Sequence, residues 1–133
     1  MQFNNQAGKN QRLVASSYAG ISRRQAILEA LSIEADFKII DVGCGAGDLV
    51  VELSKALGDG GRVFALDPSK DQLEEARNRC SGFPNVIFFQ CFAENIELEN
   101  DVCDVVTSTQ AFEYMKDVDK ALAESTRVLK PGG

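Results

Sequence analysis

Three glycines separate an apolar run from a helical pattern within residues 39–48, where a ligand could lie against bare backbone. Glycine has no Cβ and adopts positive φ easily, so the chain can turn sharply there and be approached closely. The apolar run predicts a buried strand and the following period predicts a helix. A helix N-terminus offers unpaired N–H groups to a carboxylate or phosphate. Gly43, Gly45 and Gly47 are therefore candidate ligand-binding residues, with Cys44 as a small residue between them.

An acid ends the next apolar run. Residues 62–66 are followed by Asp67, which lies twenty residues after Gly47. An acid at the tip of the second strand of a doubly wound sheet is placed to bind a ribose. Its two carboxylate oxygens can each accept a proton from one hydroxyl of the vicinal diol. The glycine turn and Asp67 together predict a cofactor that contains a nucleoside.

The spacing of the glycines discriminates between nucleoside cofactors. The dinucleotide fingerprint is G-x-G-x-x-G, whereas this turn is G-x-G-x-G and has Asp48 where the third glycine belongs. A carboxylate there would repel a pyrophosphate, so an NAD(P)-binding oxidoreductase is the less favoured alternative. Asp41 would also be unfavourable near a phosphate but favourable near a cation. S-adenosylmethionine fits better, because it combines a ribose and a small carboxylate with a cationic amino group and sulfonium.

Five segments occur in a characteristic order along residues 39–133, namely 41–47, Asp67, 93–96, 104–108 and 127–133. Their order and spacing resemble those of class I S-adenosylmethionine-dependent methyltransferases of the broad small-molecule group. The resemblance implies an enzyme that transfers a methyl group from S-adenosyl-L-methionine to a small-molecule acceptor. Methyl transfer needs chiefly an in-line arrangement of donor and acceptor, and a general base is optional. We therefore assign no catalytic residue.

The same resemblance assigns roles to residues around the expected site. Asp41 and the three glycines would hold the methionine end of the cofactor, and Cys44 would be a small filler. Pro68, directly after the ribose-binding Asp67, would lie beside the adenine. Ser108 would present its backbone to the methionine amino group, with Thr109 on the same rim.

Phe92 departs from the family pattern. Members usually carry an aspartate at this position, before Ala-Glu, and it hydrogen-bonds the adenine amino group. The ring of Phe92 cannot accept that hydrogen bond, so adenine recognition would fall to the Ala93 backbone amide and to stacking on the ring. This departure keeps open an alternative of another class, a non-catalytic binding or assembly module that retained the fold.

Composition narrows the class of protein. The 133 residues carry a net charge of −6, so no basic field would attract nucleic acid or an anionic membrane. No apolar run approaches the roughly 18 residues that span a bilayer. The four cysteines form no CxxC pair and there is no histidine, which argues against a metal site. We expect a cytoplasmic protein with reduced cysteines, no metal, and no nucleic-acid or membrane partner.

Strands and helices alternate along the chain. Strands are predicted at 38–42, 62–66, 86–91 and 104–107, helices at 48–57, 70–80 and 118–129, a short turn at 110–115, and a helical pattern over 12–31. This alternation predicts an α/β fold with a doubly wound, Rossmann-like parallel sheet and helices on both faces. By resemblance the strand order is 3-2-1-4. Residues 1–11 would be a flexible leader and 12–133 the cofactor-binding core.

The chain ends where family members enter a fifth strand, so we interpret it as part of a longer enzyme. The fourth strand would then have an uncovered outer edge, through which the chain could self-associate. We expect this piece alone to bind cofactor weakly or not at all and to show no methyl transfer. Arg12 and Tyr18 are candidates for a lid, and Glu113 and Tyr114 for contacts with the acceptor.

Overall fold

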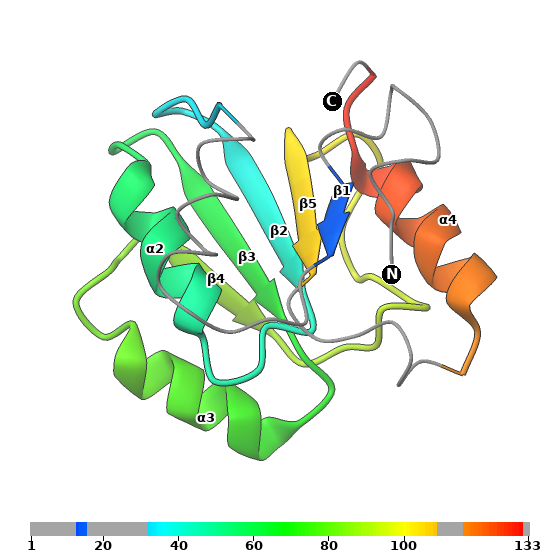
Figure 1. Cartoon of the computed structure of the whole chain (residues 1–133), viewed down its shortest axis with the longest axis horizontal. Coiled ribbons are helices and arrows are strands. Elements are labelled where there is room, and N and C mark those ends of the chain that lie inside the picture. The colour runs from blue at the N-terminus through cyan, green and yellow to red at the C-terminus, as the bar shows by residue number, and fades with distance from the viewer. Residues whose placement is uncertain (1–12, 16–31, 109–115, 132–133) are drawn as a thin grey trace.

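The computed structural model describes residues 13–15, 32–108 and 116–131, and these form a parallel sheet flanked by helices (Figure 1). The strand order is β1-β5-β2-β3-β4. The strands are β1 (Leu13–Ala15), β2 (Lys38–Val42), β3 (Arg62–Leu66), β4 (Val86–Phe89) and β5 (Val105–Ser108). The helices are α2 (Asp48–Ala56), α3 (Lys70–Arg79) and α4 (Val118–Val128).

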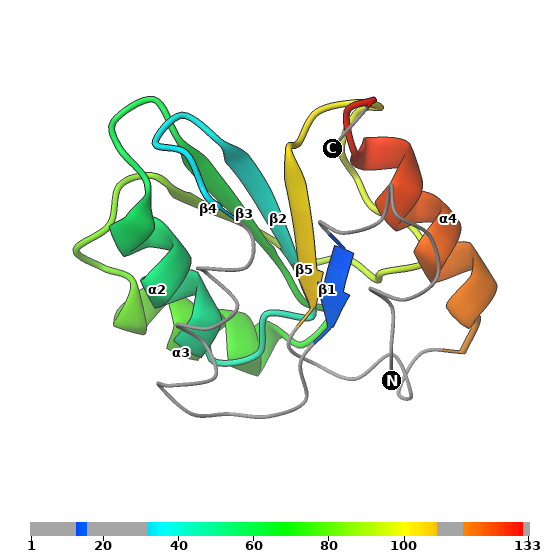
Figure 2. The ribbon, with the colours of Figure 1, turned by 45° about the horizontal axis from the view of Figure 1, so that its top comes forward.

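The sheet is doubly wound, as predicted. Taken in chain order, the four predicted strands β2, β3, β4 and β5 lie in the spatial order 3-2-1-4, and every pair is parallel. Helices α2 and α3 cover one face and α4 covers the other (Figures 1 and 2). The winding reverses between β2 and β5, and ligands of such sheets bind at the carboxyl ends of the strands at that point.

The core consists of two apolar layers, one on each face of the sheet. Neighbouring residues of a strand point to opposite faces, so Ile39 packs with α2 and α3 while Ile40 packs on the α4 side. Strand β5 and, after Lys38, strand β2 are buried on both faces, which explains the consecutive apolar residues 39–40 and 105–106. The buried polar residues of these strands, Asp41, Thr107 and Ser108, therefore need a special explanation.

Local signals set the helix boundaries close to their predicted places. Ser69 caps α3 by accepting a hydrogen bond from the Gln72 amide at 3.3 Å, which confirms the predicted capping pattern. Asp117 caps α4 in the same way through the Lys120 amide at 3.0 Å. The predicted strands and helices from residue 38 onward end within two residues of the observed ones.

Strand β1 corrects two expectations. Its residues were predicted within a helical pattern, yet Leu13–Ala15 pairs in parallel with β5, with Leu13 opposite Val106 and Ala15 opposite Ser108. The physical reason is that an open sheet edge offers unpaired N–H and C=O groups to any extended segment, whatever its helical periodicity. The outer edge of β5 is thus covered over residues 106–108, and we do not propose self-association through it.

Other expectations fall outside the described residues. They are the leader 1–11, the remaining helical pattern over 16–31, the turn at 110–115, and the candidates Arg12, Tyr18, Thr109, Glu113 and Tyr114. Among the helices that are described, none is both long and apolar enough to cross a membrane.

Candidate functional site

The glycine turn links the end of β2 to the start of α2. Gly43, Gly45 and Gly47 have φ values of +69°, +56° and +92°. L-residues that carry a side chain rarely adopt such values. The Cys44 amide donates to the Leu66 carbonyl at 2.8 Å, so the turn is fastened to the end of β3. These glycines are therefore required by backbone conformation, as the sequence predicted.

Cys44 is buried inside the turn. Its thiol donates to the Gly45 carbonyl, with 3.6 Å between sulfur and oxygen. Burial, reinforced by the nearby carboxylates of Asp41 and Asp67, raises the pKa of the Cys44 thiol far above its ordinary value. The thiol therefore stays protonated and packs as a small core group, which supports the filler role rather than a nucleophilic one.

Asp67 lies at the tip of β3 and faces the glycine turn. It is only 5% exposed, and its Oδ2 accepts a hydrogen bond from the Gly45 amide at 2.9 Å. Its Oδ1 accepts one from the Ser69 amide at 2.8 Å, so both oxygens are fixed in direction. An ionised carboxylate has about four lone-pair sites, so two remain for the hydroxyls of a ligand.

Asp41 lies in β2 and is completely buried. Its Oδ1 accepts a hydrogen bond from the Thr107 hydroxyl at 2.8 Å, whereas its Oδ2 has no partner. Burial raises the pKa of Asp41 to about 7; the Thr107 hydrogen bond opposes this shift and the charge of Asp67 adds to it. An unpaired buried carboxylate oxygen is costly, so it marks a place where a proton donor or cation is favoured.

Thr107 was not among the predicted cofactor-binding residues. It lies directly opposite Asp41 in the parallel register of β2 and β5. The sequence did contain a signal, because Thr107 is a polar residue at the end of the apolar run that enters β5. Only the strand register identifies its partner, which is 66 positions away.

The residues expected around the adenine lie at the carboxyl ends of β3 and β4. Pro68 is exposed, Phe92 is 64% exposed, and Ala93 is buried. The two strand ends are joined, since the Asp67 amide donates to the Phe89 carbonyl at 3.2 Å. The phenyl ring of Phe92 is thus available to a ligand. Ser108 is buried at the end of β5, in register with Val42.

Arg79 of α3 fastens the glycine turn from outside. Its Nε donates to the Ala46 carbonyl at 3.0 Å, and its Nη1 lies 3.1 Å from the Asp48 carboxylate. Beneath the turn, a Cβ placed on Gly47 would lie 3.1 Å from the Cβ of Ala76, so α3 packs tightly there. Arg79 could not be predicted from the sequence, because no local pattern relates it to the turn.

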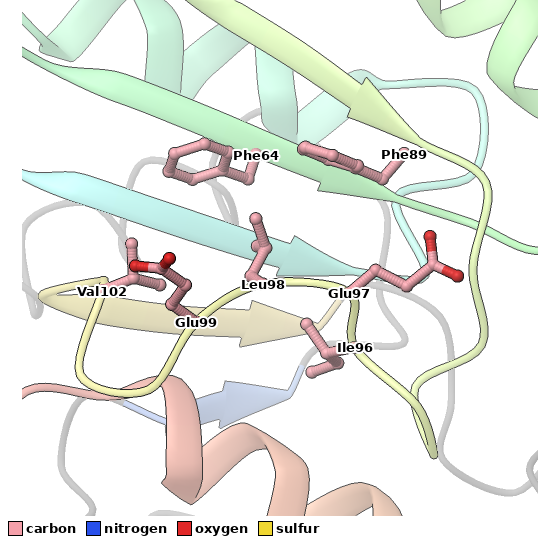
Figure 3. A pocket seen from close by; sticks show the side chains of 7 residues that line it. All are labelled: Phe64, Phe89, Ile96, Glu97, Leu98, Glu99 and Val102. Atoms are coloured by element: carbon pink, nitrogen blue, oxygen red, sulfur yellow. The ribbon is translucent and has the colours of Figure 1, made fainter.

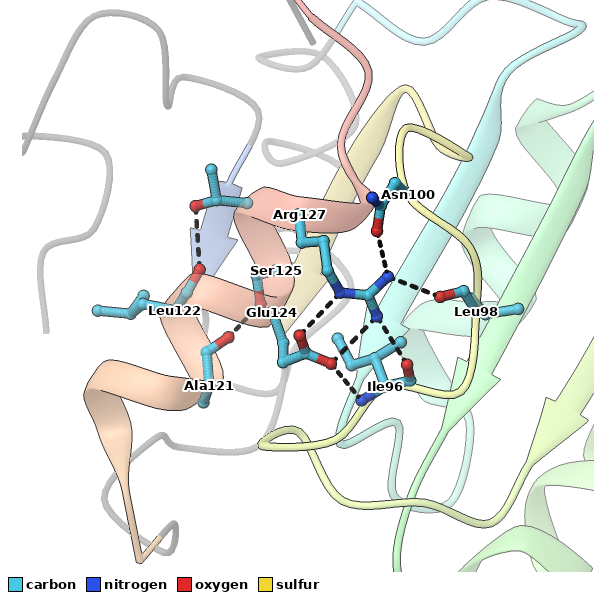
Figure 4. Close-up of polar contacts among 9 residues, drawn as sticks. Ile96, Leu98, Asn100, Ala121, Leu122, Glu124, Ser125 and Arg127 are labelled. Carbon is cyan, nitrogen blue, oxygen red and sulfur yellow. Dashed lines mark hydrogen bonds and ion pairs between the residues drawn. The ribbon is translucent and has the colours of Figure 1, made fainter.

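The segment between β4 and β5 is fixed to α4 by two charged residues (Figure 4). Arg127 donates to the carbonyls of Ile96 at 2.8 Å and Leu98 at 2.9 Å, and to the Asn100 side chain at 2.7 Å. Glu124 pairs with Arg127 at 2.8 Å and accepts the Ile96 amide at 2.9 Å. This network holds the segment that follows the adenine-side residues.

Glu94 makes a second connection to α4, at its other end. Its Oε2 accepts the amides of Lys116 at 3.0 Å and Asp117 at 3.4 Å. A carboxylate at this place also interacts favourably with the helix N-terminus. Ala93, the neighbour of Glu94, is therefore positioned by α4.

A separate apolar hollow of about 430 Å³ lies on the α4 face of the sheet (Figure 3). No predicted cofactor-binding residue lines it, so it is distinct from the glycine turn. Its lining consists of Phe64, Phe89, Ile96, Glu97, Leu98, Glu99 and Val102. Among the described residues, no group of three or more His, Cys, Asp or Glu side chains could hold a metal ion.

Comparisons with known proteins identify the family. The profile of the family described as "Methyltransferase domain" matches residues 39–133, and the chain belongs to this family. A demethylmenaquinone methyltransferase of Staphylococcus saprophyticus is 32% identical over 133 residues, which cover 98% of this chain and 57% of that protein. The chain spans 57% and 46% of the length of two such Staphylococcus enzymes, and 35% of an uncharacterized Streptomyces fradiae protein that is 32% identical over 120 residues.

Solved structures confirm the fold. A SAM-dependent methyltransferase from Aquifex aeolicus superposes with a TM-score of 0.76 at 27% identity, covering 81% of this chain and 58% of that one. The [4+2]-cyclase SpnF has the same fold, with a TM-score of 0.76 at 22% identity over 83% of this chain and 41% of that one. The fold is thus that of class I S-adenosylmethionine-dependent methyltransferases, although it also occurs in a protein named for other chemistry.

Proposed function

We propose that the protein containing this chain transfers a methyl group from S-adenosyl-L-methionine to a small-molecule acceptor, and that this chain carries the cofactor site. One observation supports the proposal above all. Two buried acids, Asp67 and Asp41, flank a positive-φ glycine turn, and Asp41 retains a carboxylate oxygen without a partner. A ligand with a ribose at one end and a cationic group at the other complements this arrangement.

Different residues would contact different parts of the cofactor. Asp67 would accept the ribose hydroxyls with the lone pairs that Gly45 and Ser69 leave free. The turn would lie against the methionine end, with Asp41 near its amino group. Pro68 and Phe92 would flank the adenine ring, and the Ala93 amide would bind its edge, as the sequence suggested.

Ser108 completes the proposed site on the β5 side. Ser108 ends β5 in the strand position next to Val42, immediately before the glycine turn. We propose that the backbone of Ser108 meets the methionine amino group; a cofactor contact of Thr109, outside the described residues, remains a proposal from the sequence.

The chemistry requires orientation more than acid–base catalysis. When bound, the cofactor would supply an activated methyl group on a sulfonium. An electron pair of the acceptor would form the new bond, the carbon–sulfur bond would break to leave a neutral thioether, and the proton lost by the acceptor would pass to solvent. The residues of this chain would hold the donor in place beside the glycine turn. Correct alignment of donor and acceptor can contribute up to about 7–11 kcal/mol, so no general base is assigned.

The class of acceptor is a proposal of its own. Curated relatives are named for demethylmenaquinone, so aromatic or quinone-like small molecules are the first acceptors to screen. A cytoplasmic location is supported by Cys44, Cys80, Cys91 and Cys103, which are all free and buried. The net charge of −6 gives no support to a nucleic-acid or anionic membrane partner.

The findings affect the two alternative functions, an oxidoreductase that binds a dinucleotide and a non-catalytic module, in different ways. The structure weakens one argument against a dinucleotide, because Arg79 partly neutralises Asp48, whose charge would repel a pyrophosphate. Family membership now argues against the oxidoreductase more strongly than Asp48 does. The alternative of a non-catalytic binding or assembly module draws on Phe92, whose side chain lacks the acceptor expected for the adenine amino group.

An activity assay tests the proposal. The whole protein is incubated with S-adenosylmethionine labelled in its methyl group and a panel of quinones, phenols and amines. We expect label in one acceptor class, and a large loss in Asp67→Ala but not in Asp71→Ala, which removes an exposed acid in the first turn of α3. Tight cofactor binding with no transfer to any acceptor would favour the non-catalytic alternative.

A further inference from the structure

Gln90 occupies a distinctive place at the end of β4. Its side-chain Nε2 donates to the carbonyl of Pro68 at 3.3 Å, so the side chain bridges from one strand end to the next. This contact determines which side-chain atom of Gln90 faces Pro68, because only the amide nitrogen can donate a hydrogen bond to a carbonyl. The Oε1 atom is thereby left as a hydrogen-bond acceptor.

The surroundings of Gln90 suit a planar, partly apolar ligand with a donor group at its edge. Pro68 immediately follows the buried Asp67, and Phe92 lies two residues after Gln90. Pro68, Gln90 and Phe92 are all exposed, whereas Asp67 and Ala93 beside them are buried. Two apolar rings and one oriented amide are thus presented at the carboxyl ends of β3 and β4.

We propose that Gln90 determines the base specificity of the cofactor, with its Oε1 accepting a hydrogen bond from the exocyclic amino group of adenine. Phe92 cannot provide this acceptor, since its side chain has no polar atom. The inference rests on the proposed function, because it assumes that the adenosyl group binds at this corner. Adenine presents an amino donor where hypoxanthine presents a carbonyl acceptor, so a fixed Oε1 attracts the first and repels the second.

The experiment compares two ligands whose bases differ in the exocyclic group on C6 and in the proton that hypoxanthine carries on N1. Dissociation constants are measured calorimetrically for S-adenosylhomocysteine and S-inosylhomocysteine with the whole protein that contains this chain, as wild type, Gln90→Met and Gln90→Glu. We expect wild type to prefer the adenosyl ligand by about three- to tenfold, the range for one partly exposed hydrogen bond. Met has a similar length and only a weakly accepting sulfur, so it should reduce the preference most. Glu retains an acceptor oxygen but loses the donor to the Pro68 carbonyl, so it should keep only part of the preference.

Controls separate the possible failures. Gln72→Met alters an exposed glutamine in α3 and should leave the preference unchanged. Thermal melts monitored by circular dichroism establish that each variant is folded. If wild type binds the adenosyl ligand and Gln90→Met keeps the full preference, the role of Gln90 is wrong while the proposed function stands. If folded wild type binds neither ligand, the proposed function fails and the role of Gln90 fails with it.

Discussion

Asp67 and Gly45 are joined by a 2.9 Å hydrogen bond from the Gly45 amide to the Asp67 carboxylate. The bond connects the tip of β3 to the centre of the turn that follows β2, across 22 positions of sequence. It sets the direction of the carboxylate and the shape of the turn at once. The two strongest sequence signals of this chain are therefore one structural unit.

Substitution of Asp67 tests that unit. Asp67→Ala should weaken the binding of S-adenosylhomocysteine by at least about tenfold, since hydrogen bonds to a charged group contribute about 1.5–3 kcal/mol. Calorimetry measures the affinity, and Asp71→Ala is the matched control because that acid is exposed on the neighbouring helix. Equal affinities for wild type and Asp67→Ala would rule out the ribose assignment.

Two glycines allow a controlled test of the turn. Gly47→Ala should destabilise the fold by about 1–2 kcal/mol, because φ is +92° and the new Cβ would lie 3.1 Å from that of Ala76. Gly82→Ala should be neutral or slightly stabilising, since a Cβ there meets nothing within 4 Å. Urea denaturation measures both. Similar stabilities for the two variants would contradict the described turn.

The raised pKa of Asp41 predicts that the stability of the fold depends on pH. Its pKa rises from 3.8 in the unfolded chain to about 7 in the folded one, so the folded state holds the extra proton between these values. Stability should therefore fall as pH rises from about 4 to about 7, and change little above that. The shift corresponds to a loss of up to about 4 kcal/mol at 1.36 kcal/mol per unit.

The matching variant for Asp41 is Asp41→Asn, which cannot titrate. As pH rises across this range, the unfolding free energy of wild type should fall relative to that of Asp41→Asn. The contributions of other titrating groups are common to both proteins and cancel in the difference. A difference independent of pH would show that Asp41 is not a buried acid of raised pKa. Binding of the cationic cofactor should strengthen in wild type as pH rises through about 7, because Asp41 becomes charged.

Arg127 is expected to stabilise the segment between β4 and β5. Arg127→Met removes the donors to the Ile96 and Leu98 carbonyls and should cost on the order of 2–3 kcal/mol of unfolding free energy. It should also raise the pKa of Glu124, which Arg127 holds below its ordinary value. Lys55→Met, an exposed cation in the last turn of α2, should change stability by less than about 0.5 kcal/mol.

Amide hydrogen exchange locates the effect of Arg127. Exchange over residues 96–100 should accelerate in Arg127→Met before the rest of the sheet opens. Uniform acceleration across all strands would mean that Arg127 stabilises the fold globally and not this segment in particular.

Local patterns accounted for the features that depend on neighbouring residues. The apolar runs of β2 and β3, the glycine turn and the Ser69 cap all follow from preferences within a few positions, and these predictions are confirmed. The position of Asp67 could be predicted because strand ends of a doubly wound sheet share one edge. Resemblance added the strand order, which periodicity alone does not specify.

Features that depend on register or distant contacts could not be predicted. Thr107 reaches Asp41 only because β2 and β5 pair in one particular register. Arg79 and Gln90 act on segments 33 and 22 positions away, and no spacing rule marks them. Strand β1 is set by the edge it pairs with and not by its own periodicity. Its residues were therefore assigned wrongly to a helix.

The central claim is that the glycine turn and Asp67 bind the adenosyl cofactor. The most direct measurement is a titration of the ¹⁵N-labelled chain with S-adenosylhomocysteine to millimolar concentration, followed by amide chemical shifts, with NAD⁺ as the parallel titration. We predict saturable shifts at residues 43–47, Asp67 and Ala93 with S-adenosylhomocysteine, and none with NAD⁺. Shifts of those amides with NAD⁺ alone, or S-adenosylhomocysteine shifts confined to the hollow lined by Phe64 and Phe89, would contradict the account.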